Sequence, residues 1–289
     1  MKHLNLFIEL TRLNNPIGYM LLFWPCLWGL TLVYDFNGEI ITYFKYLTLF
    51  FLGSIIMRSA GCIVNDITDK EFDKKVQRTK NRPVASGKIS VKLAWSYTLT
   101  LCFFAFLILI NFNLFTIILA IGSIPFAFTY PLMKRFTYWP QFFLGITFNY
   151  GIILGWVSIN DSLNLTPVIL YIGAIFWTLG YDTIYGFQDI KDDEIIGLKS
   201  TSIKFKKKPS LFLISCYLIT ITCLLAIGII MKFNFIFYIF LTIPFLHLFF
   251  YQIKNLNIEI SENCSKIFKS NNILGFLIFI NLLLGKIFI

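Results

Sequence analysis

The stretch Asn-Asp-Ile-Thr-Asp-Lys-Glu-Phe-Asp at residues 65–73 follows directly on a long apolar run. Its second and third aspartates, Asp69 and Asp73, lie 3 and 7 residues after Asp66. In a helix, where each residue turns by about 100°, these offsets place the three carboxylates on one face. Carboxylates so close together repel one another unless a cation lies between them. Oxygen ligands suit a hard ion such as Mg²⁺, which also keeps positions for phosphate oxygens. The stretch therefore predicts a metal site.

A second acidic stretch lies much later in the chain and ends another apolar run. Asp189 and Asp193 follow Asp182 by 7 and 11 residues, which again predicts one helical face. Each stretch alone has a simpler explanation, as a solvated helix end paired with nearby lysines or as a surface turn. The occurrence of two such faces in one chain favours a functional site.

The composition is typical of a polytopic membrane protein. Hydrophobic residues make up 57% of the 289 residues, the mean hydropathy is +0.74, and 14% of residues are charged, against roughly 25% in soluble domains. We expect one all-α transmembrane domain over residues 1–289. The six cysteines are scattered without a CxxC pair and are expected to be small buried hydrophobes.

Apolar runs long enough to cross a bilayer, which needs about 20 residues, indicate the number of spans. We expect a short amphipathic segment over residues 1–15, followed by nine transmembrane helices. Their predicted ranges are 16–34, 42–64, 91–110, 113–130, 139–158, 165–187, 209–230, 234–252 and 271–288.

The net charge of +10 comes mainly from lysines and arginines in the loops. This distribution is explained by a membrane topology and gives no reason to expect nucleic acid as a partner. All of the 25 Lys and Arg residues except Lys45, Arg58, Lys232 and Lys286 lie in the first segment or in alternate loops. The positive-inside rule then places the N-terminus and the long loops at about 66–90 and 188–208 in the cytoplasm. The sequence shows no cleavable signal and no transit peptide, so we expect a bacterial inner membrane.

Basic residues surround the two acidic stretches. Arg78 and Arg82 follow the first, and Lys134 and Arg135 lie after the fourth span. Such an arrangement suits a diphosphate. The carboxylates bind metal ions, the metal ions bind phosphate oxygens, and the surrounding basic side chains bind the remaining negative charge. There is no GxxxxGK[ST] loop, which argues against an ATPase, and no Ser/His/Asp set stands out.

These motifs resemble those of the UbiA-type membrane prenyltransferases, in order and over nearly the whole chain. The first acidic stretch with Lys-Asn-Arg-Pro at 80–83 resembles one family signature, and Tyr-Asp-Thr-Ile-Tyr at 181–185 with Asp189 and Asp193 resembles the second. Met-Arg-Ser-Ala-Gly-Cys at 57–62 and Tyr-Pro-Leu-Met-Lys-Arg at 130–135 point to the 4-hydroxybenzoate polyprenyltransferase branch, which serves ubiquinone synthesis. Asn14 stands where this branch often has an aspartate.

The resemblance implies nine helices around a central cavity, capped by the loops after helices 2 and 6. It implies transfer of a polyprenyl group from a diphosphate to the ring carbon meta to the carboxylate of 4-hydroxybenzoate, with Mg²⁺ as cofactor. The implied metal ligands are Asn65, Asp66, Asp69, Asp73, Asp182, Asp189 and Asp193. The six aspartates among them are also the implied catalytic residues. The implied diphosphate ligands are Arg78, Arg82, Lys134 and Tyr130, and the acceptor candidates are Arg58, Arg135 and Arg12.

Other functions remain open at this point. Related prenyltransferases act on dihydroxynaphthoate, homogentisate or haem, and would share the metal site. A cation transporter would place paired charges near the bilayer midplane, whereas here only Arg58 lies deep in a span. A CDP-alcohol phosphotransferase also uses membrane aspartates, but its glycine-, alanine- and arginine-containing spacing is not found here.

Overall fold

The computed structural model describes residues 2–77 and 79–287, and every regular element in these ranges is helical. Seven helices are long and apolar enough to cross a membrane. They are Ile40–Thr68 (α3), Val91–Leu109 (α5), Leu114–Phe136 (α6 with its short continuation), Leu165–Gly186 (α10), Pro209–Ile230 (α13), Phe235–Ile253 (α14 with η2) and Ser261–Ile287 (α15).

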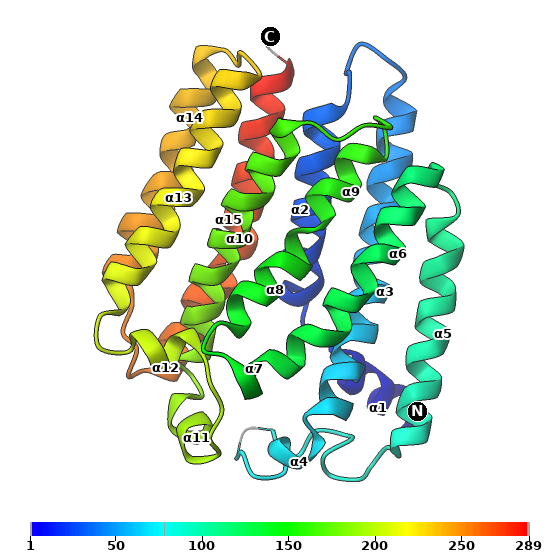
Figure 1. Cartoon of the computed structure of the whole chain (residues 1–289), viewed down its shortest axis with the longest axis vertical. Helices are drawn as coiled ribbons and strands as arrows, with labels where there is room; N and C mark the ends of the chain where they lie inside the picture. Colours follow the sequence, from blue (N-terminus) through cyan, green and yellow to red (C-terminus); the bar gives the residue numbers. More distant parts are fainter. Residues whose placement is uncertain (1, 78, 288–289) are drawn as a thin grey trace.

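Two further predicted spans form shorter helices. The first predicted span, 16–34, forms α2 (Ile17–Val33), with 17 residues. The fifth is divided into α8 (Pro140–Asn149) and α9 (Gly151–Val157), which follow one another through the bundle in Figure 1. The predicted amphipathic segment forms α1 (Lys2–Thr11).

The outer faces of the bundle are apolar. Leu99, Phe103, Leu114 and Phe235 are 66%, 58%, 71% and 75% exposed, respectively. A soluble protein does not present such large apolar faces to water, whereas lipid accommodates them. The helices also satisfy their own backbone groups, as the bilayer requires. These features identify an integral membrane protein.

Side-chain caps set where several of the helices begin. The side-chain oxygens of Ser90, Asn113, Asn164 and Asn234 accept backbone N–H groups in the first turns of α5, α6, α10 and α14, at 2.7–3.2 Å. Each cap satisfies a donor that has no partner within the helix. A serine or asparagine just before an apolar run therefore marks where the helix begins.

Two predicted boundaries are wrong. The last helix begins at Ser261 rather than at 271, because Cys264, Ile267 and Ser270 are buried and extend its packed face by almost three turns. The second predicted span, given as 42–64, continues to Thr68 as part of α3. Both extensions carry polar residues, which a hydropathy window excludes.

Short helices cover one end of the bundle. They are α4 (Lys70–Asp73), α7 (Met133–Phe136), α11 (Ile190–Ile195) and α12 (Thr201–Phe205), with the turn η1 (Tyr130–Leu132) leading into α7. Figure 1 shows these short helices at the lower end with the N-terminus, and the C-terminus at the opposite end. The loops after α3 and after α10, both predicted to be cytoplasmic, therefore lie at the same end.

The helix α2 runs through the centre of the bundle and packs closely on α9. A Cβ atom at Gly29 would lie 2.1 Å from the Ile152 carbonyl oxygen, and one at Gly155 would lie 2.2 Å from that of Cys26. Small residues allow two backbones to approach this closely in a membrane. On its other side, α2 is held to α15 by the Trp28 indole, which donates to the Gly275 carbonyl oxygen at 3.0 Å.

A buried polar network joins α15 to three more helical elements at the core, α10, α13 and η2 (His247–Ile253). Asn271 Oδ1 accepts from Trp177 Nε1 at 2.8 Å and from Gln252 Nε2 at 3.0 Å. Gln252 Oε1 in turn accepts from the Tyr217 hydroxyl at 2.6 Å. Because unpaired polar groups are costly in an apolar interior, the network fixes how α10, α13 and α15 pack.

The close contact between α2 and α9 leads to a prediction. Gly155→Ala should destabilise the detergent-solubilised protein by about 1–3 kcal/mol, because the added methyl group meets backbone atoms that cannot move aside. Gly53→Ala in α3 is the matched control, since no atom lies within 4 Å of its Cβ position. A thermal melt in which the two variants behave alike would contradict the packing described here.

Candidate active site

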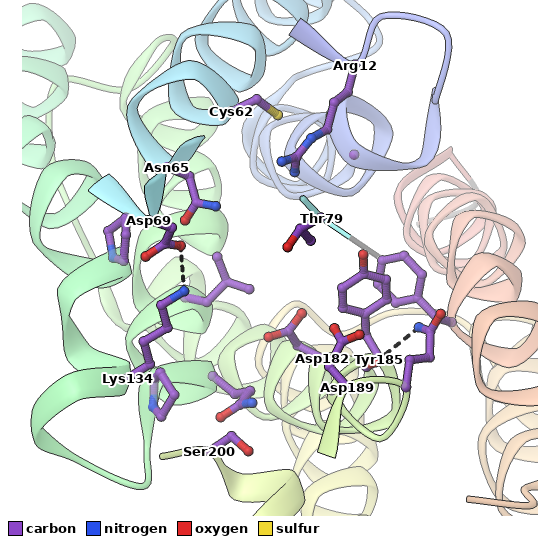
Figure 2. Close-up of a pocket in the computed structure, with 18 of the residues that line it drawn as sticks. Arg12, Cys62, Asn65, Asp69, Thr79, Lys134, Asp182, Tyr185, Asp189 and Ser200 are labelled. Atoms are coloured by element: carbon purple, nitrogen blue, oxygen red, sulfur yellow. Dashed lines mark hydrogen bonds and ion pairs between the residues drawn. The ribbon is translucent and has the colours of Figure 1, made fainter. Parts of the chain in front are cut away.

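A cavity of about 570 Å³ opens at the end of the bundle that carries the short helices. Figure 2 shows Asn65, Asp69 and Lys134 on one side of it and Asp182, Tyr185 and Asp189 on the other, with Arg12 above. Both acidic stretches therefore contribute to one cavity although more than 100 residues separate them.

The first acidic stretch does not form one continuous helix. The helix α3 ends at Thr68, Asp69 stands outside it with φ −94° and ψ 4°, and α4 then carries Asp73. The predicted single helical face is therefore wrong in its geometry. Asn65, Asp69 and Asp73 line the cavity, whereas Asp66, in the last turn of α3, does not.

Arginine side chains pair with two of these carboxylates. Arg12 donates to Asp66 Oδ1 at 2.6 Å, and Arg82 donates to the same oxygen at 3.3 Å. Arg82 also donates to Asp73 Oδ2 at 2.8 Å. Charges buried this deeply require such partners, since breaking a buried ion pair costs about 3–5 kcal/mol.

Asp69 is held differently. Lys134 donates to its Oδ2 at 2.5 Å, whereas its buried Oδ1 has no hydrogen-bond partner among the described residues. The Arg135 guanidinium stays 3.9 Å from that oxygen and instead donates to the Thr68 carbonyl oxygen at 2.8 Å, at the end of α3. Burial raises the pKa of Asp69, and Lys134 acts in the opposite direction. A cation near Oδ1 would complete the environment of this carboxylate.

The second acidic stretch bends where α10 ends. Asp182 lies in α10, whereas Asp189 precedes α11 and Asp193 lies within it, so this stretch is not one continuous helix either. The Lys199 N–H donates to the Lys134 carbonyl oxygen at 2.9 Å, and Thr201 N donates to Gln141 Oε1 at 3.0 Å. These bonds tie the loop after α11 to α7 and α8, so that it closes over the cavity.

The oxygen donors along this cavity fit a hard divalent cation. Carboxylates from both acidic stretches and the Asn65 amide line it, and Asp69 Oδ1 lacks a hydrogen bond from any described residue. No group of three or more Asp, Glu, His or Cys side chains within residues 2–77 and 79–287 is gathered closely enough to hold a metal ion as it stands. Asp66, Asp69 and Asp73 instead form ion pairs with arginine or lysine side chains.

Among the described residues, one arginine reaches the cavity from within a membrane span. Arg58 of α3 lies beside Gly18, where an added Cβ would come within 2.8 Å of its Nε, and its Cζ lies 5.5 Å from the centre of the Phe148 ring. Its buried Nε has no hydrogen-bond partner among the described residues. A guanidinium in this setting is suited to bind a planar anion.

Aromatic side chains form part of the wall near Asp182. The ring of Phe268 lies 4.6 Å from that of Tyr185 and 5.8 Å from that of Tyr181, between centroids. All three residues line the cavity. The aromatic faces can stabilise a cation and keep water away from it.

Most of the residues expected from the sequence line the cavity. They are Arg12, Arg58, Asn65, Asp69, Asp73, Arg82, Tyr130, Lys134, Asp182, Asp189 and Asp193. Asp66 and Arg135 do not line it, and Arg78 lies outside the described residues.

Sequence reasoning missed several residues that also line the cavity. They are Thr79, Gln141, Phe148, Ser265, Phe268 and Lys269. Ser265, Phe268 and Lys269 recur at helical spacing just before the last apolar run, which is the one signal that points to them.

Relatives of known name resemble the chain along nearly its whole length. It is 38% identical over 283 residues to the mitochondrial 4-hydroxybenzoate polyprenyltransferase of Rattus norvegicus, an alignment that covers 98% of this chain and 75% of the relative. It is 40% identical over 291 residues to 4-hydroxybenzoate geranyltransferase 2 of Lithospermum erythrorhizon, covering 99% and 92%.

Solved structures share the fold. The apo structure of a UbiA homologue from Aeropyrum pernix K1 superposes with a TM-score of 0.75 at 21% identity, covering 91% of this chain and 96% of the other. A UbiA homologue from Archaeoglobus fulgidus, bound to GPP and Mg²⁺, gives a TM-score of 0.72 at 17% identity, covering 97% and 99%. The model of the UbiA prenyltransferase family matches residues 22–283, and the chain belongs to that family.

Proposed function

We propose that this protein transfers a polyprenyl group from an all-trans polyprenyl diphosphate to 4-hydroxybenzoate, at the ring carbon meta to the carboxylate, an early step of ubiquinone biosynthesis. The observation that carries the proposal is one cavity lined by two acidic stretches and a basic rim. It occurs in a chain 38–40% identical to proteins named for prenyl transfer to 4-hydroxybenzoate.

Divalent metal ions, Mg²⁺ by preference, would be held by residues from both acidic stretches. The ligands we assign are Asn65, Asp69, Asp73, Asp182, Asp189 and Asp193. When bound, the metal neutralises charge that develops on the leaving diphosphate. The Mg²⁺ and GPP found with the Archaeoglobus fulgidus homologue support this assignment.

Basic side chains would take the rest of the diphosphate charge. Arg82 and Lys134 line the cavity beside Asp73 and Asp69, and Tyr130 lines it as well. Arg78 retains its predicted role from the sequence motif. Groups that strengthen their hold as negative charge grows on the departing oxygens favour cleavage of the allylic C–O bond.

Cleavage produces an allylic cation, which water would capture. The aromatic wall of Tyr181, Tyr185 and Phe268 offers its ring faces and excludes water. The ring carbon ortho to the hydroxyl of 4-hydroxybenzoate then attacks the cation, and its proton passes to a basic oxygen in the cavity. A cavity aspartate or the released diphosphate supplies that oxygen.

Arg58 is the residue we assign to the acceptor carboxylate. It lines the cavity, which Arg135 does not, and it lies in α3 before the acidic stretch that ends this helix. Of the other two candidates, Arg135 donates to the backbone of α3 and Arg12 is paired with Asp66. Arg58 is thus the candidate whose position and partners suit the acceptor best.

The remaining assignments concern the membrane. We propose one catalytic domain of nine crossings, in which α2 and the α8–α9 pair are the two crossings besides the seven long helices. The basic loops and the cavity mouth lie at one end, which the positive-inside rule assigns to the cytoplasm. Location in a bacterial inner membrane stays a prediction, since several relatives are named as mitochondrial.

The function is tested with membranes that contain the protein, 4-hydroxybenzoate, a long-chain polyprenyl diphosphate and Mg²⁺. Mass spectrometry should detect the prenylated acid, EDTA should abolish its formation, and added Mg²⁺ should restore it. Prenylation of dihydroxynaphthoate or homogentisate alone would overturn the acceptor. Metal-dependent ion flux in liposomes, without product from any acceptor, would favour a transporter.

The metal assignment predicts the effect of two neighbouring substitutions. Asp189→Asn should lower turnover by about 10²–10³-fold, the effect typical of losing one group that stabilises developing charge. Asp192→Asn is the matched control, because Asp192 lies three residues after Asp189, in the first turn of α11, but does not line the cavity. Equal activity of the two variants, both with wild-type melting temperatures, would remove Asp189 from the metal site.

The role of Arg58 predicts a change in acceptor preference. The wild-type protein should prefer 4-hydroxybenzoate to 4-hydroxybenzamide, which lacks the negative charge, by at least about tenfold. Arg58→Gln should lose this preference and keep the wild-type KM for the polyprenyl diphosphate. A variant that still discriminates between the two acceptors would show that another residue binds the carboxylate.

A further inference from the structure

Asp66 differs from the other carboxylates of the first acidic stretch. It does not line the cavity, although Asn65 on one side and Asp69 on the other both do, and Asp69 is just as deeply buried. Its Oδ1 is already the acceptor of two guanidinium groups, from Arg12 at 2.6 Å and from Arg82 at 3.3 Å. A metal ion at this oxygen would have to displace both.

The two arginines come from two segments of the chain, which also meet in a small apolar cluster that includes Leu10 and Val84. Arg12 lies just beyond α1 and adopts a left-handed backbone with φ 55°, which is uncommon for a residue other than glycine. Arg82 lies in the loop after α4. Both arginines line the cavity, whereas Asp66 does not. Asp66 therefore pairs with both side chains from behind the cavity wall.

Each guanidinium retains donors beyond those used by the carboxylates. A guanidinium has five N–H groups, of which Arg12 uses one on Asp66 and Arg82 uses its Nη1 on Asp66 and Asp73. Two like charges this close repel each other, and the carboxylate between them offsets that repulsion. The pair is therefore preorganised to bind a dianionic group.

We infer that Asp66 is a positioning residue that holds Arg12 and Arg82 as a pair toward the diphosphate, and that it is not a metal ligand. The inference rests on the proposed function, because it takes the diphosphate from there. It changes two assignments made from the sequence. Asp66 leaves the metal site, and Arg12 moves from the acceptor to the diphosphate.

Asp66→Asn and Asp69→Asn form the matched pair that tests this inference. Binding of Mn²⁺ alone, measured by electron paramagnetic resonance on the purified protein, should stay within about threefold of wild type for Asp66→Asn and fall by at least about tenfold for Asp69→Asn. Inorganic diphosphate, titrated with Mn²⁺ present, should bind at least about tenfold more weakly to Asp66→Asn.

Kinetics separate positioning from a general loss of structure. Asp66→Asn should raise the KM for the polyprenyl diphosphate by at least about tenfold and leave the KM for 4-hydroxybenzoate within about threefold. Loss of Mn²⁺ binding equal to that of Asp69→Asn would overturn the inference. So would an unchanged affinity for diphosphate.

Arg12→Gln keeps the inference testable if Asp66→Asn does not fold. This variant should bind diphosphate at least about tenfold more weakly, with Mn²⁺ binding unchanged. A raised KM for 4-hydroxybenzoate with normal diphosphate binding would return Arg12 to the acceptor and overturn the inference. The binding measurements need no prenyl transfer. If the variants changed Mn²⁺ and diphosphate binding as expected but the wild-type protein prenylated no acceptor, the proposed function would be refuted and the role of Asp66 would stand.

Discussion

The burial of several carboxylates at the end of an apolar helix is the constraint on which the site depends. Asp66 and Asp69 are each 1% exposed and Asp73 is 7% exposed. Ionised groups so deeply buried must be paired with opposite charges or bind a metal ion. The chain brings Arg12, Arg82 and Lys134 to them from three segments. The need for positive charge therefore contributes to the positions of α1, of the loop after α4 and of α7, together with the apolar cluster of Leu10 and Val84.

The same need explains how the end of the bundle is closed. Lys134 is fixed by its ion pair with Asp69, and its carbonyl oxygen accepts the Lys199 N–H of the loop after α11. That loop carries the residues that follow the second acidic stretch, and Gln141 holds it from α8. One ion pair on the first stretch thus helps to place the second stretch across the cavity. Neither stretch would form the site alone.

The sequence predicts what depends on composition and spacing, and misses what depends on tertiary contacts. Hydropathy located the spans because lipid imposes a minimum apolar length, but it began α15 too late, since polar residues such as Ser265 and Lys269 face the cavity there. Helical spacing grouped Asp66 with Asp69 and Asp73, whereas the chain leaves α3 at Asp69, and Asp69 and Asp73 line the cavity without Asp66. Arg135 carries the expected charge, yet it caps α3, which spacing cannot reveal.

The cavity joins two environments that the proposed chemistry needs together. Its mouth is charged, as binding and stabilising an anionic leaving group requires, and the wall near Asp182 is aromatic, as an allylic cation requires because it survives only where water is excluded. A soluble domain would have to build a dry interior for a long prenyl chain. A membrane protein receives that interior from the lipid, and needs only to place the charged groups where the helices end. The acidic stretches lie at that boundary for this reason, and Arg58, deeper in α3, is suited to hold the acceptor between the two environments.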